Sequence, residues 1–533
     1  MLTVWLAIIR IGRVPSVAES HRALEALDAE QREFLGIPEG PLLSYAAFHA
    51  WLTRLLEPLD SGADLPARRI TNREQRARVA ERSLDQRRKS ADAAEHRHRV
   101  VNLLIAGSID EPTPEGSAGD IVADETIIDL AGSTEGMGTK PEKHRGAAYI
   151  GGYYMRDRTT GTAQTGGSAR YITKQGFGIG VTAVSRIGSP SNLYGIAPVI
   201  TGIAIHAPTS GSLEGLALAI AAHKENGFDG RRSKRPNAKL PNLVVDMGYS
   251  VKTGFSSLLL DEGYAPVVRF PKNRQTVWAS DNPDPVNGGQ SAGPLQIDGV
   301  FYCPSAISLV KGKKPIGRLN DLLADKDGFD ARDRVLKQLF PLMMGTNSRP
   351  RKARVSAGRP SAFEKPEEMD CYKIELVCPA VQGRVKCPLK PQSLVTAFDK
   401  PEVEPTWEAS RYRCCSQSQL TLTYSEEQWK LAQWGLVPGS WEHAIYYEAA
   451  RSLTEQQFSR MKSQHVTGID HLKWSPKREP LLTLIIALWV AATNLAIQDK
   501  HYSRPVRRGS VTMRHKQLEK YLGRPPVKTP PRT

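Results

Sequence analysis

Two aspartates lie in apolar segments that normally exclude charge. Asp124 lies inside IVADETII, and Asp246 ends LVVD just before MGYS. If these segments form neighbouring strands of one sheet, the two carboxylates are held close together and repel each other unless a cation lies between them. Hard oxygen ligands beside phosphate suit Mg²⁺ or Mn²⁺. Alternatively, each aspartate only caps a turn, and either one considered alone favours that simpler interpretation.

A third acidic residue lies on a predicted helix. The segment Tyr446–Lys462 reads YYEAARSLTEQQFSRMK. On a helix, Arg451 and Glu455 are neighbours one turn apart, and Lys462 lies two turns beyond Glu455 on the same face. Glu455 can then join the two aspartates around two metal ions, with the flanking cations placed for phosphates. The alternative is an ordinary salt bridge within the helix, worth about 0.3–0.5 kcal/mol.

The elements that must position these residues follow from the apolar patterns. Alternating elements after a run of three strands predict an α/β fold, with a mixed sheet covered by helices. In chain order we expect strands at Ile121–Leu130, Tyr171–Val184 and Tyr194–His206, a helix at Ser210–Glu225, a strand at Leu243–Asp246, a helix at Thr253–Glu262 and a strand at Ala265–Phe270.

This order, with Asp on the first and fourth strands and Glu on a later helix, resembles the ribonuclease-H-like core of DDE transposases from bacterial insertion sequences. The resemblance covers about residues 115–500. The gap of 209 residues between Asp246 and Glu455 is similar to that of members with a β-strand insertion domain. LVVDMGYS resembles the family's second-Asp segment, and KWSPKREPLLTLIIALWVAATNL resembles its buried C-terminal helix.

Those members share a motif of Tyr, two residues, Arg, three residues, Glu, six residues and Lys. Arg451, Glu455 and Lys462 fit this spacing, whereas Glu448 holds the Tyr place and Tyr447 lies one residue away. Asp129 is a rival to Asp124, and strand alternation puts the two on opposite faces. The Asp-x-Thr pattern at 124–126 is closer to the family and favours Asp124.

The resemblance implies a DNA transposase that cleaves phosphodiester bonds at the ends of a mobile element and joins them to target DNA. Asp124, Asp246 and Glu455 would be catalytic and would hold two Mg²⁺ or Mn²⁺ ions. Arg451, Lys462 and Tyr447 would contact DNA. The implied partners are the double-stranded terminal inverted repeats, the target duplex and a second copy of the chain when DNA is bound. A catalytically inactive DNA-binding relic and a structure-specific nuclease of the same fold are the alternatives.

Charge supports a nucleic-acid partner. The chain has 533 residues, with 72 Lys and Arg against 56 Asp and Glu, a net charge of +16. A soluble protein this basic usually meets a polyanion. The segment from Ala67 to Val100 is strongly cationic and can contact phosphates, although such a run is more commonly a solvated helix face. Within this segment, the residues predicted to contact DNA are Arg68, Arg69, Arg73 and Arg76.

Length predicts two to four domains. We expect a helical, DNA-binding domain at 1–115, the first part of the catalytic core at 116–271, an inserted β-rich subdomain at 272–439, completion of the core at 440–500 and a basic tail at 501–533. In the first of these, helices at Ser16–Asp28 and Ser44–Leu56 could form a helix-turn-helix, although a plain bundle is favoured.

Two further features bear on location and cofactors. The uncharged run Leu481–Ile497 is short for a membrane span and contains Thr and Asn, so a buried helix is favoured. Without a secretory leader pattern, and with only six cysteines, the protein is expected in the cytoplasm, associated with the nucleoid and not with a membrane. Cys378 and Cys387 are too far apart for a zinc knuckle, so buried free cysteines are favoured over structural zinc.

Overall fold

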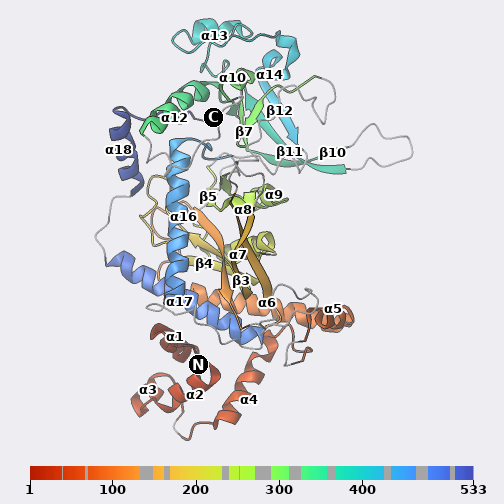
Figure 1. The fold of residues 1–533 in the computed structure, drawn as a ribbon, viewed down its shortest axis with the longest axis vertical. Coiled ribbons are helices and arrows are strands. Elements are labelled where there is room, and N and C mark those ends of the chain that lie inside the picture. Colours follow the sequence, from red (N-terminus) through yellow and green to blue (C-terminus); the bar gives the residue numbers. More distant parts are fainter. Residues whose placement is uncertain are drawn as a thin grey trace, which may run out of the picture.

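The computed structural model is an α/β protein with one mixed central sheet and helices on both faces (Figure 1). The insertion and the N-terminal helices lie at opposite ends of the molecule. The structure describes residues 1–38, 40–66, 70–131, 148–160, 169–209, 211–230, 239–250, 252–269, 290–310, 326–347, 349–356, 368–424, 434–463, 478–503 and 510–531.

In the central sheet, the two segments that carry the predicted aspartates are neighbours. The strands of this sheet are β1 (Ile121–Asp129), β2 (Gly152–Thr160), β3 (Ala169–Arg186), β4 (Ile200–His206), β5 (Asn242–Val244) and β6 (Ala265–Val267). Strand β3 pairs antiparallel with β1 on one edge and with β2 and then β4 on the other. Strands β1, β5 and β6 are parallel neighbours. Across the sheet the order is therefore β4-β3-β1-β5-β6.

Most of the predicted elements of this core are confirmed within a few residues. There are two differences. The third strand begins at Ile200 rather than Tyr194, because Gly195 and Pro198 interrupt the segment and proline cannot donate to a strand ladder. Strand β2 was not predicted, because charged residues follow its two tyrosines and hide the alternation.

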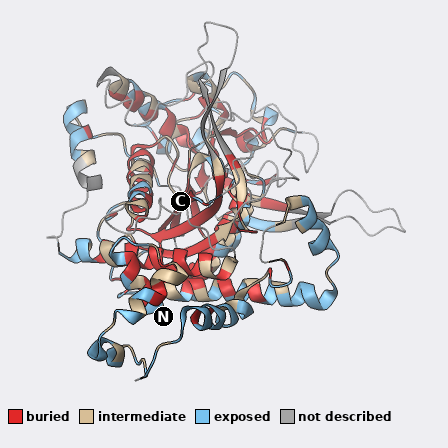
Figure 2. Cartoon of the chain, turned by 60° about the horizontal axis from the view of Figure 1, so that its bottom comes forward, coloured by how far each residue is buried: buried red, intermediate tan, exposed pale blue. Residues whose placement is uncertain are grey.

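Helices cover each face of the sheet. On one face lie α7 (Ser212–Glu225), α8 (Met247–Ser250) and α9 (Phe255–Glu262), and on the other lie α6 (Leu84–Ala106), α16 (Trp441–Lys462) and α17 (Glu479–Tyr502). Strand β1 alternates between the two faces. Ala123 belongs to the core beneath α7, and Ile128 belongs to the core beneath α17. Figure 2 shows that the sheet and these helices carry most of the buried surface.

Helix α17 is the predicted buried helix. It is the one helix of the described ranges long and apolar enough to cross a membrane, and 83% of its apolar window is buried inside the protein. Asn494 on α17 accepts a hydrogen bond from the N–H of Ile200 and donates one to its carbonyl, both at 2.8 Å. Asn102 on α6 does the same for Ile203, at 2.8 and 3.1 Å. These amides satisfy the outer edge of β4, which would otherwise present unpaired backbone groups.

Five α-helices precede the long α6 in the described part of the chain, and three of them, the first, second and fourth, pack into the core of α17. The five are α1 (Leu2–Arg10), α2 (Val17–Glu25), α3 (Ala29–Phe34), α4 (Tyr45–Leu56) and α5 (Asn72–Ala80). Trp5 and Ile8 of α1 join the same hydrophobic cluster as Trp489 of α17. The predicted helices at 16–28 and 44–56 are confirmed. Because α3 lies between them, a short turn does not connect them as a helix-turn-helix requires.

The insertion is mixed rather than mostly β. Its strands are β7 (Leu295–Ile297), β8 (Val300–Tyr302), β9 (Gly345–Thr346), β10 (Arg351–Ser356), β11 (Glu368–Val377) and β12 (Gln419–Tyr424), and its helices are α10 (Ile307–Val310), α12 (Lys326–Leu339), α13 (Pro391–Thr396) and α14 (Arg413–Ser416). Helix α12 was not predicted, although its buried Phe329 and Leu336 have helical spacing. Helix α18 (Ser510–Leu522) follows in the basic tail. There, Thr529 donates to Glu442 at 2.8 Å and ties the tail to α16.

Candidate functional site

The two predicted aspartates lie on and just after two neighbouring parallel strands. Strands β1 and β5 pair in parallel, with Val122 opposite Val244. Asp124 lies two residues further along β1, and Asp246 follows the end of β5 by two residues. Because side chains alternate along a strand, Asp124 shares the face of Val122. Arg451 of α16 contacts both aspartates, so Asp246 faces the same helix. Both valines belong to the cluster that packs against α16.

The two carboxylates are in different environments. The side chain of Asp124 is 17% exposed and that of Asp246 is 47% exposed. One oxygen of Asp124 accepts the N–H of Glu125 at 2.9 Å. Burial raises the pKa of Asp124, and the neighbouring Arg451 guanidinium opposes that shift. A cation at this position therefore stabilises the ionised form of Asp124.

Arg451 supplies that cation. Its Nη1 lies 2.8 Å from Oδ2 of Asp124, and its Nη2 lies 4.0 Å from Oδ1 of Asp246. Burial lowers the pKa of Arg451, but the carboxylates of Asp124 and Asp246 more than offset this and raise it. The predicted phosphate ligand therefore bridges the two aspartates in the structure.

Core contacts fix the orientation of α16, which carries Arg451. Tyr446 is fully buried, and its hydroxyl donates to the carbonyl of Gly188 at 3.0 Å. Gln457 accepts a hydrogen bond from Ser185 of β3 at 2.9 Å. These contacts on either side of Arg451 hold the helix against the sheet. Its guanidinium therefore faces β1 and β5.

Glu455 lies on α16 one turn beyond Arg451, and it is exposed. Within the described part of the chain, no three His, Cys, Asp or Glu side chains are close enough together to hold one metal ion. The structure therefore brings together Asp124 and Asp246, and it leaves Glu455 outside the pair. Asp129, the rival, accepts a hydrogen bond from Tyr154 of β2 and lies away from Arg451.

The other residues of the predicted helix motif are engaged inside the protein. Tyr447 is 5% exposed and its ring lies 5.0 Å from the Arg269 guanidinium, so it does not face solvent to contact DNA. Burial and the carboxylate of Asp246 raise the pKa of Tyr447 to about 12. Glu448, in the Tyr place of the motif, forms an ion pair with Arg269. Lys462 donates to the carbonyl of Ile127 in β1 at 3.0 Å.

Three supporting residues were missed from the sequence. Asp120, just before β1, accepts the N–H of Asn242 at 2.5 Å and its side-chain amide at 2.7 Å, and so aligns β5 with β1. Glu125 accepts from Ser212 at 2.8 Å and fixes the start of α7. The third, Arg269, follows β6 and neutralises Glu448. The proximity of Asp120 and Glu125 to Asp124 was the available signal; nothing local pointed to Arg269.

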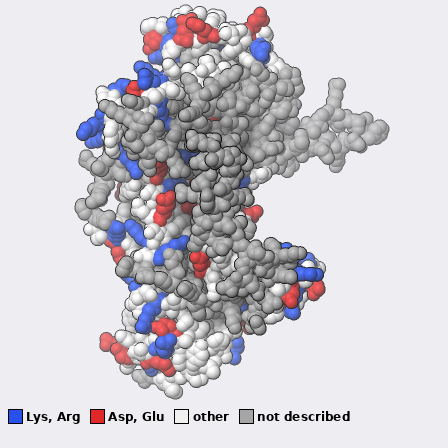
Figure 3. Space-filling model, in the orientation of Figure 1, with Lys and Arg blue, Asp and Glu red and all other residues white. Residues whose placement is uncertain are grey.

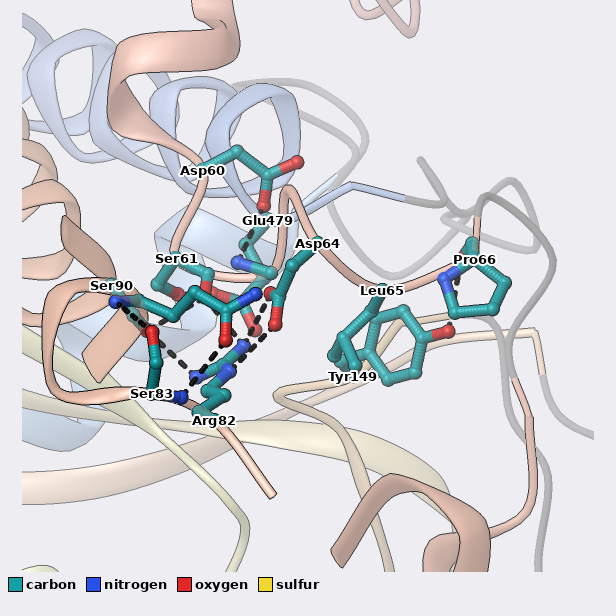
Figure 4. Close-up of polar contacts among 12 residues, drawn as sticks. Asp60, Ser61, Asp64, Leu65, Pro66, Arg82, Ser83, Ser90, Tyr149 and Glu479 are labelled. Carbon is teal, nitrogen blue, oxygen red and sulfur yellow. Dashed lines mark hydrogen bonds and ion pairs between the residues drawn. The ribbon is translucent and has the colours of Figure 1, made fainter. Parts of the chain in front are cut away.

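The cationic segment divides into structural and exposed residues. Arg82 forms an ion pair with Asp64 at 2.6 Å and donates to the carbonyl of Ser61 at 3.1 Å, as Figure 4 shows. Buried Arg97 forms an ion pair with Glu479 of α17 at 2.9 Å. These arginines therefore join α6 to the loop after α4 and to α17, rather than to a ligand.

Arg73 and Arg76, by contrast, are exposed on α5, a helix with no buried residue. Figure 3 shows Lys and Arg side chains at this projecting end of the molecule, with acidic residues among them. Exposed cations nearby on α6 are Arg87, Arg88 and Lys89. Arg68 and Arg69 lie outside the described residues.

Comparison of the chain with models of known protein families, with curated protein sequences and with solved structures finds no match.

Proposed function

We propose that this chain is a DDE-type DNA transposase that cleaves the ends of an insertion sequence and joins them to target DNA. The observation that carries the proposal is that Asp124 on β1 and Asp246 just after the parallel neighbour β5 both face one guanidinium, that of Arg451. Two carboxylates held this close are a common device for hydrolysing or transferring phosphodiesters with a divalent ion.

The strand order supports the same proposal. In the ribonuclease-H-like core, three antiparallel strands are followed by two strands parallel to the first. Strands β1, β3 and β4 form the antiparallel part here, and β5 and β6 form the parallel part. Asp124 then lies on the first core strand, and Asp246 follows the end of the fourth, close to the positions that the resemblance implies. A fold alone does not establish a reaction, so the proposal depends mainly on the aspartate pair.

The donor set fits Mg²⁺ or Mn²⁺ at the aspartate pair. Both groups are hard oxygen ligands, and they already require a positive charge between them. Asp124, Asp246 and Glu455 would hold the two ions, with the Glu455 side chain turning inward from its exposed position on α16. Bound there, the ions would polarise the phosphodiester and stabilise the attacking and leaving oxygens of an in-line displacement.

Arg451 has a second role in this proposal. In the absence of ions its guanidinium neutralises Asp124. Beside bound ions, which would supply that positive charge, the guanidinium would be available to a DNA phosphate next to the scissile bond, to which arginine can bind in a bidentate manner. Arg451 would therefore hold the site together before substrate binds and position the backbone afterwards.

The reaction has two steps of the same kind. Water attacks the phosphorus at the element's end, which leaves a 3′-hydroxyl on one product and a 5′-phosphate on the other. That 3′-hydroxyl attacks a target phosphodiester, forms the new bond and releases a target 3′-hydroxyl. The exposed cations of α5 and α6 would supply salt-dependent affinity for the duplex. We propose a dimer on paired ends, acting at the nucleoid in the cytoplasm.

An inactive DNA-binding relic is the second candidate, and two observations favour it. Glu455 does not join the aspartate pair, and Tyr447 is buried while Glu448 holds the Tyr place. A relic would keep the fold and the basic surface but lack nicking activity.

One assay distinguishes the candidates. Labelled duplexes that carry the DNA flanking the gene are incubated with the protein, Mn²⁺ and a target plasmid. Cleaved ends with 3′-hydroxyls joined to the plasmid support the transposase. Cleavage without joining supports a structure-specific nuclease of the same fold. Binding without cleavage under either metal supports the relic.

A further inference from the structure

Five of the six cysteines line one small cavity in the insertion. The cavity has a volume of about 20 Å³, room for a single water molecule or metal ion. These thiols come from four places far apart in the sequence: the end of β8, the end of β11, the loop before α13, and α14. They are Cys303, Cys378, Cys387, Cys414 and Cys415. The sixth cysteine, Cys371 within β11, is buried but does not line the cavity.

Three of the five cysteines share one local structure. Each is followed by proline in the sequence, at Cys303, Cys378 and Cys387. After each cysteine the backbone turns, and N–H groups two or three residues later donate toward the thiol. The donors are Ser305 for Cys303, Ala380 and Val381 for Cys378, and Leu389 and Lys390 for Cys387. Burial raises the pKa of all three thiols. The N–H donors oppose that shift and would stabilise each sulfur as a metal-bound thiolate.

The turns also explain why sequence spacing was misleading. Cys378 and Cys387 are too far apart in sequence for a short knuckle, but the chain between them folds back. Gln382 donates to the carbonyl of Cys378 at 3.1 Å, and Arg384 donates to the carbonyl of Pro379 at 2.9 Å. Both thiols consequently face the same cavity.

Cys415 is the best candidate for a fourth ligand. Its sulfur accepts a hydrogen bond from the indole N–H of Trp407 at 3.5 Å and lies 4.0 Å from the sulfur of Cys414. Either sulfur of that pair can be the donor. The indole N–H aimed at its sulfur therefore favours Cys415 over Cys414 as the ligand.

We propose that Cys303, Cys378, Cys387 and Cys415 bind a structural zinc ion. Four thiolates are a common ligand set for tetrahedral Zn²⁺, at about 2.3 Å from each sulfur. The thiols now surround the cavity without meeting at one point, so binding requires their side chains to close inward. Each thiol that ligates releases its proton to water, and no oxidant is needed. The ion would join the four segments of the insertion at one point.

The test is the zinc content of the purified full-length protein, expressed with zinc in the medium and measured by elemental mass spectrometry. We expect one zinc per chain. Single Cys→Ser changes at the four ligands should each reduce it at least severalfold. Cys371→Ser, a buried cysteine of the same subdomain, and Cys414→Ser should keep it. Wild type without stoichiometric zinc, retention in the ligand variants, or loss in Cys414→Ser with retention in Cys415→Ser would overturn the assignment.

A second measurement uses only the wild-type protein, so its result does not depend on whether a variant folds. Wild-type protein stripped of metal is titrated with Co²⁺, which should give the intense thiolate-to-cobalt absorption and the visible bands of tetrahedral coordination. Alkylation followed by mass spectrometry then counts free thiols without reductant. Absence of the cobalt bands, or a disulfide among the cavity cysteines, would refute the zinc site. Neither readout depends on DNA cleavage, so the result is independent of the proposed function.

Discussion

Nη1 of Arg451 lies 2.8 Å from Oδ2 of Asp124, and this ion pair connects helix α16 to the first strand of the sheet. Both side chains are largely buried, at 14% and 17% exposed. A partly buried carboxylate without a cation is costly, so the protein needs a positive charge here whether or not an ion is bound. In the proposed function, the pair would therefore link stability and metal binding at one position.

Replacing Arg451 tests this link. Arg451→Gln should lower the free energy of unfolding by about 3–5 kcal/mol in chelator, because it leaves Asp124 buried and unpaired. Mn²⁺ should restore more stability to the variant than it adds to wild type, since the ion no longer competes with the guanidinium. Urea unfolding with and without Mn²⁺ measures both effects.

The matched control is Arg351→Gln, which removes an exposed ion pair with Glu375. It should cost about 0–1 kcal/mol and should not change the response to Mn²⁺. An equal response of wild type and Arg451→Gln to Mn²⁺ would show that the guanidinium does not compete with an ion at the aspartate pair.

Asp120 makes a pH-dependent contribution to stability. Burial raises its pKa to about 6, even though Asn242 opposes the shift. A carboxyl with a raised folded-state pKa contributes stability that is present below the ordinary value and lost as pH rises through the folded value. Asp120→Asn can keep the hydrogen bonds from Asn242 without a buried charge. It should be more stable than wild type by on the order of 1–3 kcal/mol at pH 8.

At pH 4 the difference between wild type and Asp120→Asn should be small, because Asp120 is then protonated in the folded protein. Urea unfolding of both proteins from pH 4 to 8 gives the comparison. A difference that stays constant across that range would contradict the assigned shift.

Arg97 is predicted to be structural. Its partner Glu479 is 12% exposed, and Glu479 also accepts a hydrogen bond from Ser61 at 2.7 Å. Arg97→Met should destabilise the protein by about 3–5 kcal/mol because it leaves that carboxylate unpaired. The double variant Arg97→Met/Glu479→Gln should recover much of the loss in thermal or urea unfolding. If the single and double variants are equally unstable, the ion pair is not the cause.

Unlike Arg97, the exposed cations of α5 are predicted to bind DNA rather than to stabilise the fold. Neutralising Arg73 and Arg76 together to Gln should leave stability unchanged and weaken duplex binding. If both contact phosphates, the slope of log affinity against log salt should decrease in magnitude by about 1.8. Band shifts at several salt concentrations measure it.

Lys337 and Lys400, changed together to Gln, remove the same charge from exposed positions in the insertion and serve as the control. A reduction of the salt slope that is equal for the two pairs would mean that α5 makes no specific contribution to binding.

Sequence patterns could predict the features that local contacts determine. They could not predict the features that depend on contacts between distant parts of the chain. Strand alternation and element order predicted the convergence of Asp124 and Asp246, because local patterns set both. The rotation of α16 depends on long-range contacts such as that of Tyr446 with Gly188, so the burial of Tyr447 and the exposure of Glu455 were not predictable. Among the arginines, composition could not separate Arg97, bound to a distant glutamate, from exposed Arg73.

Metal-supported nicking by the intact protein tests the central proposal most directly. Supercoiled plasmid carrying the DNA that flanks the gene is incubated with wild type, Asp246→Asn and Glu455→Gln in Mn²⁺, and the relaxed product is measured beside a band shift on the same DNA. Wild type should nick, and both variants should lose at least a hundredfold in nicking rate while their band shifts stay intact. Undiminished nicking by Asp246→Asn, or none by wild type in Mg²⁺ or Mn²⁺, would contradict the assignment of these carboxylates.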